Sequence, residues 1–195
     1  MHGALIATRE RRQRLRRMMA LEIEEQPDFL RLYKLAGLNL INTYALVAVI
    51  GDISRFANSR KLVSYLGLNP SVIESGESSG DGSLKNHGRG SLRASLIQAS
   101  KRLLRTSNPL QKWGLNIALR RGQNKAAVAV ARKLTVAIWH IMQGHWNKAL
   151  EENTTLLTKL AKLATELGVP TLKELGYASK LAFQQEKLEV LRTWP

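Results

Sequence analysis

The stretch AAVAVARKLTVAIWHIM, residues 126–142, carries the most regular helical pattern of the chain. Its apolar residues recur every three or four positions, which is the period of one face of an α-helix. That face consists of Ala127, Val130, Ala131, Leu134, Ile138 and Ile141. Arg132, Lys133 and His140 fall elsewhere. The pattern predicts a long helix with one buried face and a basic remainder.

Other helical segments flank this one. Residues 92–103 carry an apolar stripe made of Leu92, Leu96, Ala99 and Leu103. Further helices are predicted at about 4–25, 29–35, 41–50, 59–65, 109–120 and 171–191. No segment shows a convincing strand pattern or an internal repeat. We therefore predict a mainly α fold. It comprises a compact helical domain with a helix-hairpin-helix-like segment, a Ser/Gly-rich active loop and flanking helical arms.

The helix-hairpin-helix-like segment is the pair 29–35 and 41–50, joined by the turn Ala-Gly-Leu-Asn at 36–39. In such a motif, free backbone N–H groups at a helix start can hold a DNA phosphate. Asn39 occupies the usual second glycine position. Helical hairpins are also common without any ligand, so both phosphate contact and plain packing stay open.

We predict three regions: a basic N-terminal helix at 1–26, a main domain at 27–147 and a C-terminal helical arm at 148–195. In the arm, Leu156, Leu160, Leu163 and Leu167 follow a 4-3-4 spacing like that of a short coiled coil. That seam fits either contact with a partner or packing within the chain.

The chain of 195 residues has a net charge of +15 and an isoelectric point near 10.6. A field of that sign favours a polyanionic partner, most often nucleic acid. A soluble basic protein without such a partner, or one that faces anionic lipid, is the alternative. The most apolar window, residues 35–50, is too short to span a bilayer, and no secretory signal is present. We expect a cytoplasmic, nucleoid-associated protein without a membrane partner.

Several chemistries are excluded by composition. The chain has no cysteine, which removes disulfides, thiolate zinc sites and a thiol nucleophile. Asp28 and Asp52 stand at predicted helix starts, where a capping role explains these acids without a catalytic one. His140 and His145 lack acidic partners at ligand spacing. We expect no metal site and no cofactor in this chain.

The segment 69–93 offers serine and arginine chemistry instead. Its serines are Ser75, Ser78, Ser79, Ser83 and Ser91. A hydroxyl can attack a phosphodiester where cationic groups stabilise the developing charge. Lys85, Arg89 and Arg93 are close in sequence, and Arg93 falls in a helical first turn that favours an anion. A flexible phosphate-binding loop without chemistry is the alternative.

Five pieces of sequence occur in a specific order: GDISRF (51–56), YLGLNP (65–70), ESG (74–76), LKNHGRGSLR (84–93) and NKAAVAVARKL (124–134). Together they resemble the C-terminal transposase domain of the IS110 insertion-sequence family, the bridge-RNA-guided DEDD recombinases, over about residues 32–146. The resemblance implies DNA recombination by two parts. One is an N-terminal RuvC-like domain with four metal-binding acids. The other carries a serine, in an S-G pair, that becomes covalently linked to DNA.

On that resemblance, Ser75 is the predicted nucleophile and Gly76 its neighbour. The family motif that contains Gly88, Leu92 and Arg93 usually has a lysine at the position of Asn86, and here Lys85 comes one place earlier. The candidate DNA or phosphate contacts are Gly76, Lys85, Arg89, Arg93, Lys125 and Arg132. DNA, a guide-type RNA and sister subunits, either copies of this chain or full-length transposase, are the implied partners.

The RuvC-like domain, and the Mg2+ that it would hold, have no counterpart in these 195 residues. Three explanations account for this: a truncated element, a misassigned start codon, or a separate half that works with another polypeptide. The rival function is a non-catalytic nucleic-acid-binding remnant that interferes with full-length transposase. A third class, a structural basic helical protein, predicts no salt-dependent affinity for DNA.

Overall fold

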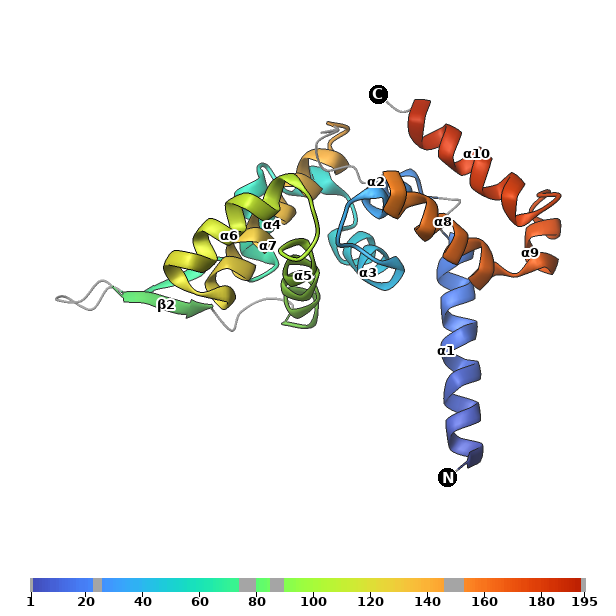
Figure 1. The fold of residues 1–195 in the computed structure, drawn as a ribbon, viewed down its shortest axis with the longest axis horizontal. Helices are drawn as coiled ribbons and strands as arrows, with labels where there is room; N and C mark the ends of the chain where they lie inside the picture. Colours follow the sequence, from blue (N-terminus) through green and yellow to red (C-terminus); the bar gives the residue numbers. More distant parts are fainter. Residues whose placement is uncertain (1, 23–25, 74–79, 85–89, 146–152, 194–195) are drawn as a thin grey trace. The chain divides into compact units, whose positions relative to one another are not determined.

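The computed structural model describes residues 2–22, 26–73, 80–84, 90–145 and 153–193. Within these ranges the chain is mainly α-helical (Figure 1), which confirms the predicted fold class. The elements in chain order are α1 (His2–Glu22), α2 (Pro27–Lys34), α3 (Leu40–Ile50), η1 (Ile53–Arg55), α4 (Ser59–Tyr65), β1 (Pro70–Ile73), β2 (Gly80–Leu84), α5 (Gly90–Leu103), α6 (Pro109–Arg121), α7 (Gln123–Met142), α8 (Asn153–Leu167), α9 (Val169–Glu174) and α10 (Lys180–Thr193).

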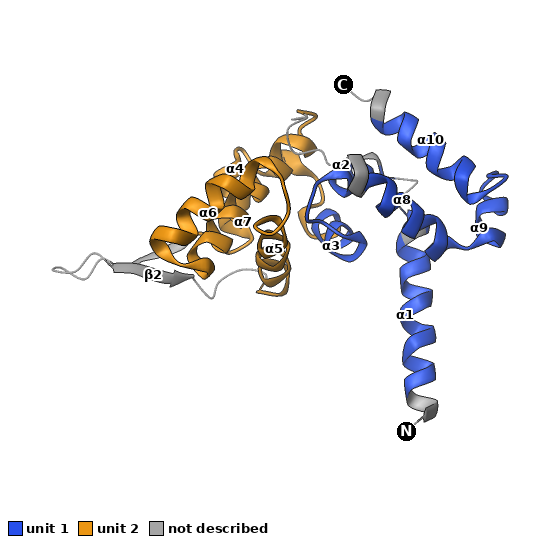
Figure 2. Cartoon of the chain, in the orientation of Figure 1, with its two compact units in different colours: residues 1–47, 151–195 blue, residues 48–150 orange. Residues whose placement is uncertain are grey.

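The chain forms two compact units, coloured separately in Figure 2. Unit 1 combines Met1–Val47 with Glu151–Pro195, so it is built from both ends of the sequence. Unit 2 is the continuous segment Ala48–Leu150. Each unit has its own buried apolar residues, and each is described separately below.

Helix α7 is the centre of unit 2, because α4, α5 and α6 all pack against it. Its predicted apolar face is buried, as is the predicted stripe of α5. Gly114 lets α6 approach closely: a Cβ atom there would lie 2.4 Å from Leu104 Cδ2 and 2.8 Å from Val130 Cγ2. Such distances are below van der Waals contact, so this position requires the absence of a side chain.

Short polar caps set the path of the chain before α4. The Asp52 carboxylate accepts hydrogen bonds from the Ser54 hydroxyl and the Ser54 N–H, and these bonds lower the pKa of Asp52. The Asn58 side chain accepts from the Lys61 N–H and caps α4, whose bounds agree with the prediction. Phe56 is buried, and its carbonyl accepts a 3.0 Å hydrogen bond from the Trp139 indole. The turn is therefore anchored to α7.

A short antiparallel strand pair, β1 and β2, was not expected from the sequence. Val72 pairs with Asp81 and Ile73 with Gly80, with an irregularity next to Pro70. Val72 and Ile73 favour a strand in β1, but Pro70 and the glycines and aspartate of β2 are of types depleted in strands, so the pattern is too short to predict the pair. The pairing is local to the Ser/Gly-rich segment and leaves the mainly α class unchanged.

The core of unit 1 joins α2 to the three C-terminal helices. Its buried members are Phe29, Leu30, Tyr33, Leu156, Leu160, Leu163, Ala164, Leu167, Leu172, Tyr177, Phe183 and Leu191. All four leucines of the predicted C-terminal seam are in this cluster. The seam therefore packs within the chain, which was one of the two alternatives.

A reciprocal set of hydrogen bonds fixes α8 to the end of α2. The Lys159 ammonium donates to the carbonyls of Tyr33 (2.8 Å) and Leu35 (2.7 Å), where α2 leaves carbonyl groups without helical partners. The Tyr33 hydroxyl donates in return to the Lys159 carbonyl at 3.1 Å. Burial, followed by the nearby Glu166 charge, raises the pKa of Tyr33, so the neutral donor form is favoured.

We predict that Lys159→Met destabilises unit 1 by about 1–3 kcal/mol, because two partly buried carbonyls lose a charged donor. Hydrogen–deuterium exchange of the α8 amides measures this loss within unit 1 alone. The control is Lys162→Met, an exposed position on the same helix, for which we expect a change within about 0.5 kcal/mol. Equal effects of the two substitutions would contradict a capping role for Lys159.

Candidate nucleic-acid interface

The predicted site residues divide into two groups. Ser75, Gly76, Lys85 and Arg89 lie outside the described residues. Arg93, Lys125 and Arg132 lie in helices α5 and α7 of unit 2, and the structure gives their surroundings.

Arg93 stands in the first turn of α5, as predicted, and its side chain is half-buried. Its Nη1 donates to the Gly67 carbonyl at 3.5 Å, just after α4. Its Nη2 is also close to Gly90, since a Cβ atom there would lie 3.9 Å from it. Arg93 therefore has a structural contact that connects the start of α5 to the end of α4. A phosphate contact by Arg93 remains a prediction.

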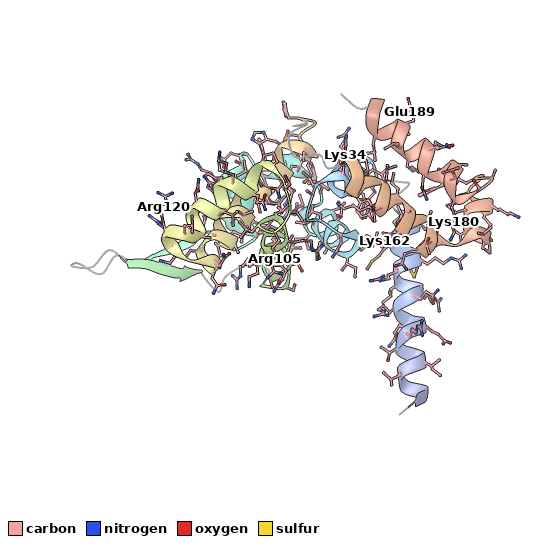
Figure 3. All side chains as sticks on the ribbon, viewed as in Figure 1. Lys34, Arg105, Arg120, Lys162, Lys180 and Glu189 are labelled. Carbon is pink, nitrogen blue, oxygen red and sulfur yellow. The ribbon has the colours of Figure 1, made fainter. Side chains whose placement is uncertain are left out.

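The sequence between Asp81 and Glu151 contains no acidic residue. The helices α5, α6 and α7 therefore have no acid of their own to neutralise their basic side chains. The exposed basic residues of this segment, called here the α5–α7 cations, are Arg102, Arg105, Lys112, Arg120, Arg121, Lys125, Arg132 and Lys133. Figure 3 labels Arg105 and Arg120 among them.

Lys125 and Arg132 are separated by two helical turns of α7, so they project from the same side of that helix. Both are exposed, whereas Ala126, Val130 and Ala131 between them are buried. A charged group is costly to bury, and the packing that buries the apolar face of α7 leaves these two cations exposed to solvent. The result is positive potential on the outside of unit 2.

An aromatic side chain lies among the α5–α7 cations. Trp113 on α6 keeps 39% of its surface exposed, and the Lys133 ammonium from α7 lies 5.6 Å from the centre of its ring. Aromatic faces next to cations are typical of surfaces that bind nucleic acid. Nothing in the sequence indicates this pair, because the residues are on different helices and only the α6–α7 packing brings them together.

The pair α2 and α3 has the predicted layout of two helices joined by a glycine turn, with Gly37 at a φ of 82°. The Asn39 side chain accepts a 2.9 Å hydrogen bond from the Asn42 N–H. One of the donors at the start of α3 is thus already used within the chain. Phosphate binding by this segment stays a prediction.

Two further properties concern the described residues. They include no group of three or more His, Asp or Glu side chains arranged to hold a metal ion. His140 and His145 instead make an edge-to-face ring contact, with ring centres 6.3 Å apart. None of the described helices is both long enough and apolar enough to cross a membrane.

Residues 30–113 match the model of a protein family described as "Transposase IS116/IS110/IS902 family". The matched segment covers less than half of the length of this chain. A curated relative is the "Transposase for insertion sequence element IS1111A" from Coxiella burnetii (strain RSA 493 / Nine Mile phase I). It is 32% identical over 119 residues, which cover 59% of this chain and 33% of the relative. The aligned part thus spans about a third of the relative's length.

We predict that Lys125→Gln with Arg132→Gln weakens binding of duplex DNA and makes it less sensitive to salt. Two lost phosphate contacts would lower the slope of log Kd against log salt by about 2. Fluorescence anisotropy over a salt series measures this slope.

The matched control is Arg14→Gln with Lys173→Gln, which removes the same charge from exposed positions of unit 1. We expect this control to keep the wild-type slope. A control with the same loss as the α7 variant would show that total charge, and not the position of Lys125 and Arg132, determines binding.

Proposed function

We propose that this chain is the serine-bearing part of an insertion-sequence transposase, which binds DNA through unit 2 and attacks a phosphodiester with Ser75. The observation that carries the proposal is the family match over residues 30–113, a range that includes Ser75, Gly76, Lys85, Arg89 and Arg93. Lys125 and Arg132 lie beyond that range and are proposed from exposure and charge alone.

The proposed step exchanges one phosphodiester for another. The Ser75 hydroxyl oxygen forms a bond to phosphorus while the bond from phosphorus to one sugar oxygen breaks. The hydroxyl proton leaves to a base, and the departing sugar oxygen takes up a proton. No net hydrolysis occurs, so the energy of the phosphodiester is kept for rejoining. Cationic groups close to the phosphate would stabilise the charge that develops on its oxygens.

The described neighbourhood supports the binding part of this proposal. Helix α5 begins directly after the Lys85–Arg89 segment, and Arg93 in its first turn is tied to the Gly67 carbonyl just before β1. The α5–α7 cations have no acidic residue between Asp81 and Glu151 to neutralise them. A polyanion that approaches these helices would meet a segment with an excess of positive charge.

The further partners are proposals drawn from the resemblance to the family. They are a guide-type RNA, further copies of the chain or of a full-length transposase, and a RuvC-like domain that holds Mg2+. We propose that the division into residues 1–26, 27–147 and 148–195 marks a linker helix, the transposase domain and an added arm. The non-catalytic remnant remains the rival function, and the following experiment separates the two.

The test of the proposal is a covalent-adduct assay. Wild-type protein is incubated with duplex DNA whose bridging sugar oxygen is replaced by sulfur, because the thiolate that leaves is poor at reversing the reaction. We expect an SDS-resistant, protease-sensitive complex with DNA, in one arm with Mg2+ alone and in a second arm with a RuvC-like domain added. Ser75→Ala should abolish it, and Ser78→Ala, the same change in the same segment, should keep it.

Binding is measured in parallel by anisotropy, where Ser75→Ala should leave the salt slope unchanged because the change removes no charge. A wild-type protein that binds DNA but forms no adduct in either arm would overturn the catalytic proposal in favour of the non-catalytic remnant. An adduct that persists in Ser75→Ala would show that another residue is the nucleophile.

A further inference from the structure

Unit 1 contains a pocket of about 510 Å³ between α1 and α8. Its lining residues are Arg9, Arg12, Gln13, Arg16, Thr158, Ala161, Lys162, Thr165 and Glu166. Figure 3 labels Lys162 on α8. None of these residues belongs to the transposase match at 30–113 or to the candidate interface of unit 2.

The lining comes from one face of each helix. Arg9, Arg12 and Arg16 recur at the three- and four-residue spacing that places side chains on one side of α1. On α8, Thr158, Lys162 and Thr165 do the same. The apolar seam of α8 is already buried in the unit 1 core, so α1 faces the polar side of α8. Polar and charged side chains on both faces leave an open pocket in place of a packed apolar contact.

The charge in the pocket is unbalanced. Glu166 is the one carboxylate among the described lining residues, and it is paired with Arg16. Arg9, Arg12 and Lys162 have no ion-pair partner among the described residues. An apolar ligand would find a single small apolar lining residue, Ala161. A cation would be repelled, so the pocket favours an anion with several negative charges.

Two contacts fix the end of α1 that carries Arg16 and Arg17. Arg16 donates to the Glu166 carboxylate, and Arg17 donates to the hydroxyl of Thr171, which is buried at the start of α9. These contacts fix one end of the pocket face of α1 against α8 and α9. The arginines one and two turns earlier are therefore presented to solvent from a fixed helix, which lowers the entropy cost of binding.

We propose that the α1–α8 pocket binds the phosphate backbone of duplex DNA. From Arg9 to Arg16 the helix rises about 10 Å, a length over which one strand of duplex DNA carries about three phosphates. Guanidinium groups suit phosphate because they donate two parallel hydrogen bonds to it. The choice of DNA as the polyanion rests on the proposed function, whereas the pocket and its charge do not.

The test removes three charges from the pocket without touching the Arg16–Glu166 pair. The variant is Arg9→Gln with Arg12→Gln and Lys162→Gln, all three at exposed positions, so the fold is expected to survive. The matched control is Arg11→Gln with Arg14→Gln and Lys173→Gln, which are exposed and do not line the pocket. Fluorescence anisotropy over a salt series is recorded for a duplex DNA and for a hairpin RNA of equal length, and circular dichroism compares the folding of the variants.

We expect the pocket variant to bind duplex DNA at least about tenfold more weakly than the control, with a salt slope lower by about 3. If the two variants have equal salt slopes while the wild-type protein still binds DNA, the proposal for the pocket is wrong and the proposed function is unaffected. If the pocket variant loses affinity only for the hairpin RNA, the assignment of the pocket to DNA is wrong. A wild-type protein without affinity for duplex DNA would overturn both proposals.

A second measurement does not depend on any variant. Phenylglyoxal modifies exposed arginines, and mass spectrometry reads the extent at each position. In wild-type protein, duplex DNA should protect Arg9 and Arg12 more strongly than Arg11 and Arg14 on the same helix. Equal protection of all four would contradict the pocket as the contact surface.

Discussion

The fold of unit 2 depends on the burial of the apolar faces of α5 and α7, in a helical segment whose sequence after Asp81 contains many cations and no acid of its own. Burial of a cation costs several kcal/mol unless a partner compensates for it, and most cations of this segment are exposed to water. Helices α5 and α7 bury only apolar or uncharged faces. The arrangement of α4, α5 and α6 around α7 then leaves the positive charge on the outside of the unit.

In unit 1, by contrast, cations have acids and backbone carbonyl groups as partners. Glu166 pairs with Arg16, and Lys159 donates to the carbonyls at the end of α2. Lys187 is almost fully buried, with its ammonium 5.7 Å from the Tyr177 ring centre and 5.9 Å from that of Phe183. The contacts of Arg16 and Lys159 join segments from the two ends of the chain. They give α8 one face in the core and one face that lines a cationic pocket.

Much of the helical layout was predictable because it depends on local rules. The span of α4 and the apolar stripes of α5 and α7 follow from period and capping chemistry, whereas Asp52, expected to cap the next helix, caps η1, and Asn58 caps α4. The strands β1 and β2 were not predictable from propensity, since Val72 and Ile73 are the only strand-favouring pair in β1 and the glycines and aspartate of β2 are depleted in strands.

The contacts between residues far apart in the chain could not be predicted from the sequence. Tyr33 and Lys159 are separated by 126 positions, and nothing in either segment alone indicates their pairing. The same holds for Lys133 with Trp113 and for Arg12 opposite Lys162. The sequence shows that α1 is rich in arginine. The pocket forms only because α8 packs against α1 in the folded unit. Of the candidate site, motif order indicated Ser75 and its neighbours, whereas the structural contact of Arg93 with Gly67 required the tertiary fold.

We propose that the chain combines a candidate chemical segment that contains Ser75 with two cationic surfaces that would bind DNA. The most direct test of those surfaces is the reactivity of each lysine toward an acetylating reagent, read by mass spectrometry with and without duplex DNA. We predict that duplex DNA protects Lys112, Lys125 and Lys133 in unit 2 and Lys162 in unit 1, and that Lys173 stays reactive. Uniform protection of all lysines, or none in α6 and α7, would contradict it.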